Sequence, residues 1–219
     1  MNTGNVPIIW VEGIIASGKT TLAKQIAKRL EFKLLEEPVE SNPYLAEFYK
    51  DPKKYAFGFQ IYMLHHRYAM KQEAAFAAAR GAVKGIVLDR SIAGDRVFAA
   101  HHAFNEGNIN PLDYKCYEYC YQMMARSILP PTVLIYLNVQ AETAFARMKK
   151  RGRAEEEGVT LQYLQDIKLG YEKLLSEIRK GLVPWSHSVY VHEFLGDVDV
   201  TSDEEWEHIT ATVKDICRR

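Results

Sequence analysis

The sequence predicts an α/β domain in which helices cover both faces of a five-stranded parallel sheet. Two observations support this fold class: short apolar runs alternate with helical patterns, and a glycine-rich loop joins the first run to the first helical pattern. Alternation of this kind implies a parallel sheet. The predicted strands are residues 8–11, 32–35, 86–88, 133–137 and 189–191. The predicted helices are residues 21–30, 54–80, 95–106, 112–127, 141–150, 161–180 and 203–218.

The glycine-rich loop, residues 13–20, has the pattern of a phosphate-binding site, because two glycines with four residues between them precede Lys19 and Thr20. Its backbone can wrap around an anion, and the following helix N-terminus adds favourable partial charge. Lys19 is expected to reach the terminal phosphates of a nucleotide, and the Thr20 hydroxyl to ligate the accompanying Mg²⁺. An ordinary glycine-rich turn is the alternative, which the flanking strand and helix disfavour. The residues expected to hold the phosphates are Gly13, Ala16, Ser17, Gly18, Lys19, Thr20 and Thr21.

The composition narrows the range of partners. The chain of 219 residues is expected to form one domain, residues 1–219, because no linker-like segment divides it. Its 28 basic residues balance its 28 acidic residues, which argues against a broad electrostatic grip on nucleic acid or on an anionic membrane. No apolar run has the length of a membrane span, and three cysteines are too few for a disulfide framework. These features predict a cytoplasmic protein that acts on small molecules, without a membrane or nucleic-acid partner.

Charged residues follow the second and third predicted strands. Glu37 comes after the second strand, and Asp89 and Arg90 come at the end of the third. Because ligands of a parallel sheet bind at the carboxyl ends of its strands, these side chains should lie beside the phosphate-binding loop. One carboxylate could accept a proton from an attacking hydroxyl, a second could hold Mg²⁺, and the arginine could neutralise phosphoryl charge. Each of these residues alone would be interpreted as a solvated charge at the end of a strand. Together with Lys19 they predict phosphoryl transfer.

A further charged segment, residues 147–158, lies between two predicted helices. It carries Arg147, Arg151 and Arg153, and its glycines, Gly152 and Gly158, favour a mobile loop. Arginines on a closing lid can clamp the phosphates of ATP and exclude water. A solvated helix end is the alternative, because charge runs usually have that role.

Several ordered motifs extend over nearly the whole chain: residues 13–20, Glu37-Pro38-Val39, Phe57-Gly58-Phe59-Gln60, Asp89-Arg90-Ser91 and Arg151-Gly152-Arg153-Ala154-Glu155-Glu156. This set resembles the deoxynucleoside kinases of the deoxycytidine and deoxyguanosine kinase type. The combination is far more specific than the phosphate-binding loop alone. The resemblance implies a three-layer P-loop NTPase fold with an arginine-rich lid, and a kinase that uses ATP and Mg²⁺. It also implies a homodimer, because members of the family commonly dimerise through helices of the region around residues 114–121.

The resemblance implies a role for each matching residue. Glu37 is expected to be the general base that takes the proton from the deoxyribose 5′-hydroxyl, with Arg90 beside the same oxygen. Asp89 is expected to help hold Mg²⁺ with Thr20, and Lys19 completes the catalytic set. The lid arginines over ATP are expected to be Arg147, Arg151 and Arg153. The residues expected at the deoxynucleoside are Glu37, Tyr49, Phe59, Gln60, Met63, Arg67, Arg90, Asp95 and Glu156, among which Tyr49 and Glu156 would bind the 3′-hydroxyl and Gln60 would read the base edge.

Arg67 and Asp95 are expected to influence the choice of base. The resemblance places them where kinases that prefer deoxycytidine or purine deoxynucleosides carry an Arg and an Asp, whereas thymidine-preferring relatives carry apolar residues. A charged pair fixes donor and acceptor positions and leaves less room for the thymine methyl group. Met63 and Ala99 depart from the deoxycytidine-type pattern, which has a small residue at the first position and an aromatic residue at the second.

The sequence therefore predicts transfer of the γ-phosphoryl group of ATP to the 5′-hydroxyl of a deoxynucleoside, in nucleoside salvage. The expected acceptors are deoxycytidine or purine deoxynucleosides. Two alternatives stay open at this point. A nucleoside monophosphate kinase such as thymidylate kinase would share the loop and the lid, although Glu37 suits a neutral hydroxyl better than an acceptor phosphate. A catalytically silent relative could use the same fold as a binding subunit, although Lys19, Glu37, Asp89 and Arg90 are intact.

Overall fold

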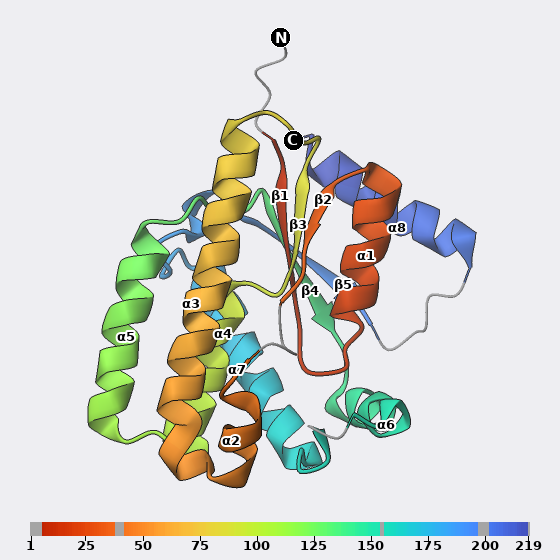
Figure 1. The fold of residues 1–219 in the computed structure, drawn as a ribbon. Helices are drawn as coiled ribbons and strands as arrows, with labels where there is room; N and C mark the ends of the chain where they lie inside the picture. Colours follow the sequence, from red (N-terminus) through yellow and green to blue (C-terminus); the bar gives the residue numbers. More distant parts are fainter. Residues whose placement is uncertain (1–5, 38–41, 154–155, 197–201, 219) are drawn as a thin grey trace.

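A parallel five-stranded sheet forms the centre of the molecule, with the strand order β2-β3-β1-β4-β5 (Figure 1). The strands are β1 (Ile8–Glu12), β2 (Lys33–Leu35), β3 (Ile86–Asp89), β4 (Val133–Asn138) and β5 (Tyr190–Leu195). The three central strands are almost entirely buried, as apolar strands covered on both faces should be. The computed structural model describes residues 6–37, 42–153, 156–196 and 202–218, apart from the side chains of Tyr49 and Ser188.

Helices cover both faces of this sheet. The described helices are α1 (Lys19–Leu30), α2 (Leu45–Lys50), α3 (Pro52–Ala79), α4 (Ile92–Ala100), α5 (Pro111–Arg126), α6 (Ala141–Arg151), α7 (Leu161–Arg179) and α8 (Asp203–Ile216). Helices α1 and α8 pack together on one side, whereas α3, α4, α5 and α7 form the layer on the other side (Figure 1). The predicted three-layer α/β fold is therefore confirmed.

The predicted elements differ from the observed ones mainly around α4. The helix expected from residue 95 begins at Ile92, because the Ser91 side chain caps it by accepting a hydrogen bond from the Ala93 amide at 3.1 Å. Its continuation is not α-helical: residues His101–Asn105 form a π-helical turn. Helix α2 was not predicted. Its six residues are too few for a clear helical period.

The core explains which helix faces are buried. The sheet residues Ile9, Trp10 and Leu134 are fully or almost fully buried, and α1, α3 and α7 place apolar side chains against them. Burial of this apolar surface is the main force that fixes the layers. Within the described part of the chain, no helix is long and apolar enough to cross a membrane. What the layers leave open is the carboxyl edge of the sheet, where the site residues lie.

Candidate active site

The phosphate-binding loop links the end of β1 to the start of α1. Gly13 has a φ of 152°, and a Cβ there would lie 2.7 Å from the Ser17 Oγ and 3.0 Å from the Leu137 carbonyl oxygen, so no larger residue fits. Gly18 has a left-handed φ of 96° as the residue before α1. The Lys19 ammonium donates to the Ile14 carbonyl oxygen at 2.5 Å. Burial and the neighbouring Arg90 lower the pKa of Lys19 to about 7. A phosphate bound in the loop would raise this pKa again, because it adds negative charge beside the amine.

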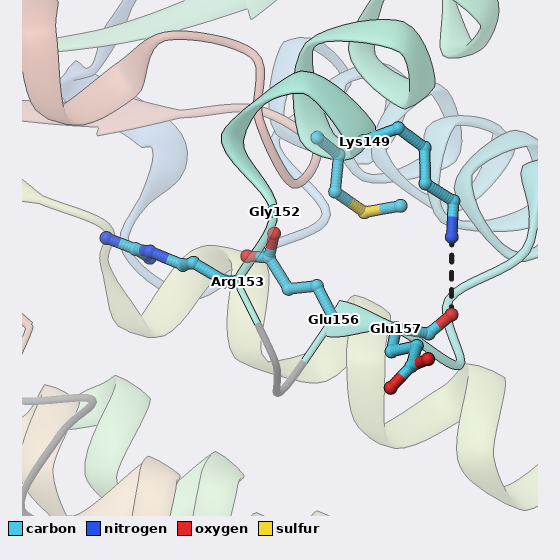
Figure 2. Close-up of a pocket in the computed structure, with 6 residues that line it drawn as sticks. Lys149, Gly152, Arg153, Glu156 and Glu157 are labelled. Carbon is cyan, nitrogen blue, oxygen red and sulfur yellow. Dashed lines mark hydrogen bonds between the residues drawn. The ribbon is translucent and has the colours of Figure 1, made fainter.

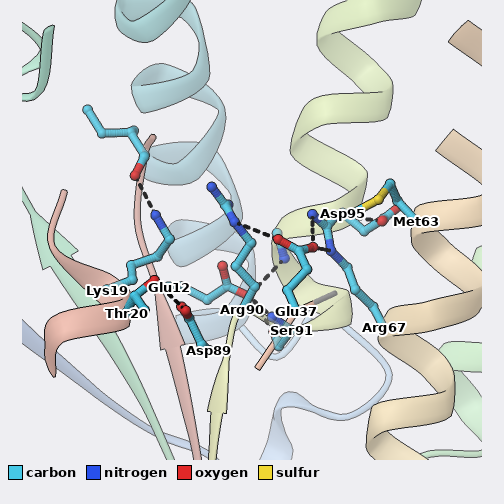
Figure 3. A network of polar contacts seen from close by, with 12 residues as sticks. Glu12, Lys19, Thr20, Glu37, Met63, Arg67, Asp89, Arg90, Ser91 and Asp95 are labelled. Atoms are coloured by element: carbon cyan, nitrogen blue, oxygen red, sulfur yellow. Dashed lines mark hydrogen bonds and ion pairs between the residues drawn. The ribbon is translucent and has the colours of Figure 1, made fainter. Parts of the chain in front are cut away.

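Thr20 and Asp89 meet at the start of α1 and the end of β3. The Thr20 hydroxyl donates to Asp89 Oδ2 at 2.5 Å, while Asp89 Oδ1 is buried and has no partner among the described residues (Figure 3). A hydroxyl beside a carboxylate with a free oxygen is the donor set that a hard cation such as Mg²⁺ prefers. These two residues therefore fit the metal-binding role that the sequence predicted.

Glu37, Arg67 and Arg90 form an ion-pair network on the wall of the cleft (Figure 3). Glu37 Oε1 lies 2.7 Å from Arg67 Nη2, and Glu37 Oε2 lies 3.2 Å from Arg90 Nε. Burial alone would raise the pKa of Glu37, but the Coulomb attraction of Arg67 and Arg90 outweighs it and holds the pKa below its usual range. Glu37 is thus an ionised carboxylate at neutral pH.

Asp95 anchors the other side of Arg67. Its Oδ2 lies 2.5 Å from Arg67 Nη1, and its Oδ1 accepts from the Gln60 amide at 3.0 Å and from the Tyr117 hydroxyl at 2.5 Å. Burial raises the pKa of Asp95, although the Arg67 charge and these hydrogen bonds oppose the shift. Gln60 keeps its Oε1 buried without a partner among the described residues, so this oxygen can accept a hydrogen bond from a ligand.

Glu12, which the sequence analysis did not single out, supports the turn that carries Arg90. Its Oε1 accepts from the Ser91 amide at 2.8 Å and from the Ser91 hydroxyl, and its Oε2 accepts from the Tyr171 hydroxyl at 2.9 Å. Arg90 has a left-handed φ of 70°, which is strained for a side chain of this size. Glu12 is buried and fixes the residues that follow Arg90, so it helps to hold the strained residue beside Glu37.

Aromatic side chains line the wall away from the phosphate-binding loop. Phe59 stacks on Phe48 with ring centroids 4.7 Å apart, and Met63 Sδ lies 3.2 Å from the Asn42 amide nitrogen. Phe48 and Asn42 were not predicted as site residues. The predicted role of Tyr49 falls on a side chain outside the described part of the structure. An apolar, aromatic wall of this kind suits the flat face of a base.

The arginine-rich segment is only partly turned toward this cleft. Arg151 Nη2 lies 2.5 Å from Glu156 Oε1, whereas Arg147 donates instead to the Gly196 carbonyl oxygen at 2.7 Å. Figure 2 shows a small pocket beneath this segment, in which the Lys149 amine donates to the Glu157 carbonyl oxygen and the Arg153 side chain extends away from Lys149. Residues 154–155 of the predicted lid lie outside the described residues.

The cleft has a volume of about 850 Å³. The predicted site residues that line it are Ala16, Lys19, Thr20, Glu37, Phe59, Gln60, Met63, Arg67, Asp89, Arg90, Arg151, Arg153 and Glu156. Those that do not line it are Gly13, Ser17, Gly18, Thr21, Asp95 and Arg147. The fold therefore gathers phosphate-binding, acid–base and base-contacting side chains around one space of ligand size.

Known proteins are similar to this chain in sequence and in fold. A family model described as deoxynucleoside kinase matches residues 9–218. The chain is 37% identical over 186 residues to deoxyadenosine kinase of Dictyostelium discoideum, covering 83% of this chain and 73% of that protein. It is 39% identical over 172 residues to deoxyadenosine/deoxycytidine kinase of Bacillus subtilis (strain 168), covering 77% and 76%. Its fold matches a structure of deoxyadenosine kinase from M. mycoides, determined with the products dCMP and a flexible dCDP bound, with a TM-score of 0.78, 29% identity and coverage of 95% and 99%. The chain belongs to the deoxynucleoside kinase family, as its motifs implied, and is a nucleotide-binding phosphotransferase.

Proposed function

We propose that the cleft transfers the γ-phosphoryl group of ATP to the 5′-hydroxyl of a deoxynucleoside, with Glu37 as the general base. The observation that carries this proposal is the buried Glu37 carboxylate, held between Arg67 and Arg90 in the cleft that Lys19 also lines. Its lowered pKa keeps it ionised at neutral pH, ready to accept the hydroxyl proton as the new O–P bond forms. Arg90, beside it, can stabilise negative charge on the phosphoryl oxygens.

The loop of residues 13–20 binds the donor phosphates in this proposal. Backbone amides and the N-terminus of α1 face the phosphates, and Lys19 neutralises their charge. Thr20 and Asp89 would hold Mg²⁺, which supplies charge neutralisation between the phosphates of the bound nucleotide. Among the described residues, no group of three His, Cys, Asp or Glu side chains could hold a metal ion. The cation would therefore share its remaining ligands with the nucleotide and with water.

The acceptor is proposed to be deoxyadenosine, deoxyguanosine or deoxycytidine, in preference to thymidine. Two similar proteins carry deoxyadenosine or deoxycytidine in their names. In this chain, the Arg67–Asp95 pair places charged groups beside Gln60 where an apolar wall would suit the thymine methyl group better. The unpartnered Oε1 of Gln60, which lines the cleft, then reads the base edge, and Phe59 packs against the face of the base.

Initial phosphorylation rates with ATP and Mg²⁺ test this proposal. The acceptors to compare are deoxyadenosine, deoxyguanosine, deoxycytidine and thymidine, with thymidine monophosphate as the control for a monophosphate kinase. We expect turnover of the first three and slower turnover of thymidine. A thymidine preference would refute the role of Arg67 and Asp95 while leaving the reaction intact, and turnover of the monophosphate alone would refute the acceptor.

The remaining sequence predictions enter here as proposals. We propose that residues 1–219 form one domain and that two copies form a dimer. A stripe of exposed residues on α5, Leu112, Cys116, Tyr119 and Met123, supports the dimer, because an apolar helix face in water favours association. Light scattering on a Met123→Glu variant tests it: we expect the mass of one chain in place of two. The cytoplasmic location stays a prediction from the sequence.

A further inference from the structure

His102 lies in the wall of the cleft, although the proposed reaction needs no histidine. It belongs to the π-helical turn that follows α4, a departure from α-helical geometry that often marks functional positions. Its ring is buried, with 4% of the residue exposed, and it lines the same cleft as Lys19, Glu37 and Phe59. The turn therefore places an imidazole where an acceptor molecule can meet it.

A carboxylate fixes the orientation of this ring. His102 Nδ1 lies 2.7 Å from Glu106 Oε2, and Glu106 is also held by the Asn108 amide at 2.7 Å. Burial alone would raise the pKa of Glu106, but the hydrogen bond from His102 and the close approach of the His101 ring hold it well below its usual range. Because an ionised carboxylate only accepts hydrogen bonds, Nδ1 must carry the proton. In the neutral ring, Nε2 is then the acceptor, and the described residues offer it no hydrogen-bond partner.

The surroundings of His102 place it on the aromatic wall rather than among the phosphate-binding groups. Its ring packs edge-on against Phe48 with centroids 5.2 Å apart, and Phe48 stacks on Phe59. Tyr163 of α7 lies on another side, with centroids 6.4 Å apart. His102, Phe48 and Phe59 therefore belong to one aromatic wall of the cleft, against which a base can bind.

We propose that His102 is a specificity-determining residue: its Nε2 accepts a hydrogen bond from the exocyclic amino group of the nucleobase, and Glu106 positions the ring for this contact. The inference rests on the proposed function, because it names a further contact for the same acceptor. Adenine and cytosine carry an exocyclic amino group at equivalent positions, the 6-amino and the 4-amino group, whereas guanine carries its amino group at C2 and a carbonyl oxygen at C6. The contact therefore favours deoxyadenosine and deoxycytidine. Thymine has no exocyclic amino group. Its carbonyl oxygen is a hydrogen-bond acceptor, so it would face the lone pair of Nε2 and be repelled by it. Selection against thymidine then has a second source besides the Arg67–Asp95 pair.

A substrate that lacks only the amino group tests this contact. We would compare kcat/KM for deoxyadenosine with that for purine 2′-deoxyriboside, in which hydrogen replaces the 6-amino group. We expect the wild-type enzyme to prefer deoxyadenosine, and His102→Phe to reduce that preference by about threefold to tenfold, the usual net value of one hydrogen bond between neutral groups. Phe keeps a ring against Phe48 but offers no acceptor. His102→Gln, whose carbonyl can accept in place of Nε2, should restore part of the preference.

His101 provides the matched control. It is also buried and also approaches Glu106, with Nε2 3.3 Å from Oε1, but it does not line the cleft. We expect His101→Phe to leave the preference between the two substrates unchanged. An equal loss with both substrates in His102→Phe, or the same reduced preference in His101→Phe, would overturn the inference. If the wild-type enzyme phosphorylates neither substrate nor any other deoxynucleoside, the proposed function itself is wrong. This outcome differs from a failure of the His102 contact alone, in which the wild-type enzyme still phosphorylates deoxynucleosides.

Discussion

Helix α3 buries two basic side chains one turn apart, and their surroundings differ. Arg67 is 5% exposed and lies between two carboxylates, 2.7 Å from Glu37 and 2.5 Å from Asp95. Lys71 is 3% exposed, has no hydrogen-bond partner among the described residues, and places its amine 3.3 Å from the centroid of the Trp10 ring. The same helix therefore carries one buried charge with full pairing and one buried amine with none.

The difference follows from the chemistry of the two side chains. A guanidinium stays charged in proteins, so it can be buried only where anions compensate it. Burial lowers the pKa of Arg67, but the attraction of Glu37 and Asp95 raises it overall. Burial lowers the pKa of Lys71 well below its ordinary value, and no contact reverses that shift. The paired arginine is thus suited to the wall of a binding cleft. The buried lysine lowers the stability of the fold, because its amine has no hydrogen-bond partner among the described residues.

The largest effect is expected from removing the paired charge. Arg67→Met leaves Glu37 and Asp95 buried without their shared partner, and we expect a loss of about 3–5 kcal/mol in the free energy of unfolding. Urea unfolding followed by circular dichroism measures it. Arg96→Met is the matched control, because Arg96 also contacts two carboxylates, Glu118 and Glu177, but is more exposed. Its loss should stay under about 1 kcal/mol, and equal losses in the two variants would contradict the importance of burial.

Replacing the Glu37 carboxylate, which pairs with Arg67 and Arg90, should lower the reaction rate more than the stability of the fold. Glu37→Gln keeps the shape of the side chain but cannot act as a base, and we expect the phosphoryl-transfer rate to fall by about a hundredfold or more. Nucleotide binding, measured by calorimetry, should survive. Glu118→Gln, a carboxylate that pairs with an arginine outside the cleft, should leave the rate unchanged. An undiminished rate in Glu37→Gln would remove Glu37 from the mechanism.

Removing the unpaired amine should stabilise the protein. Lys71→Met has a similar length and no polar group, so we expect a gain of about 1–3 kcal/mol in the free energy of unfolding at neutral pH. Thermal unfolding of Lys71→Met, Arg67→Met and the wild-type protein measures this change in stability. The two substitutions lie one helical turn apart, and we expect one to stabilise and the other to destabilise the protein. A destabilised Lys71→Met would mean that the contact with Trp10 outweighs the cost of burial.

The smallest and most specific effect is the pH dependence of that gain. Because the folded-state pKa of Lys71 is lowered, the unfolded chain binds more protons between that pKa and 10.5, and the stability of the wild-type protein rises with pH in this window. Lys71→Met lacks this contribution. The difference in free energy of unfolding between the two proteins should therefore shrink as the pH is raised from 7 toward 10. A constant difference would show that Lys71 has the same pKa in the folded and the unfolded chain.

Much of the fold was predictable because the information is local. The five apolar runs became the five strands, and the phosphate-binding loop needed only the contiguous glycines, Lys19 and Thr20. The grouping of Glu37, Asp89 and Arg90 could also be predicted from the sequence, because the carboxyl ends of parallel strands lie at one edge of the sheet. Helix α2 and the π-helical turn were missed, since a short helix and an irregular turn leave no period to detect.

The sequence by itself determined the fold class, the nucleotide loop and the family, because each depends on residue types at short, fixed spacings. Only the tertiary structure decided how the charges are compensated. Glu12 meets Ser91 and Tyr171, which are 79 and 159 residues away in the chain, and Arg67 receives its two anions from different segments. It also decided that His102 lines the cleft and that Lys71 stays unpaired. Whether a buried polar group is satisfied depends on neighbours a few ångströms away in space, and spacing along the chain does not contain that distance.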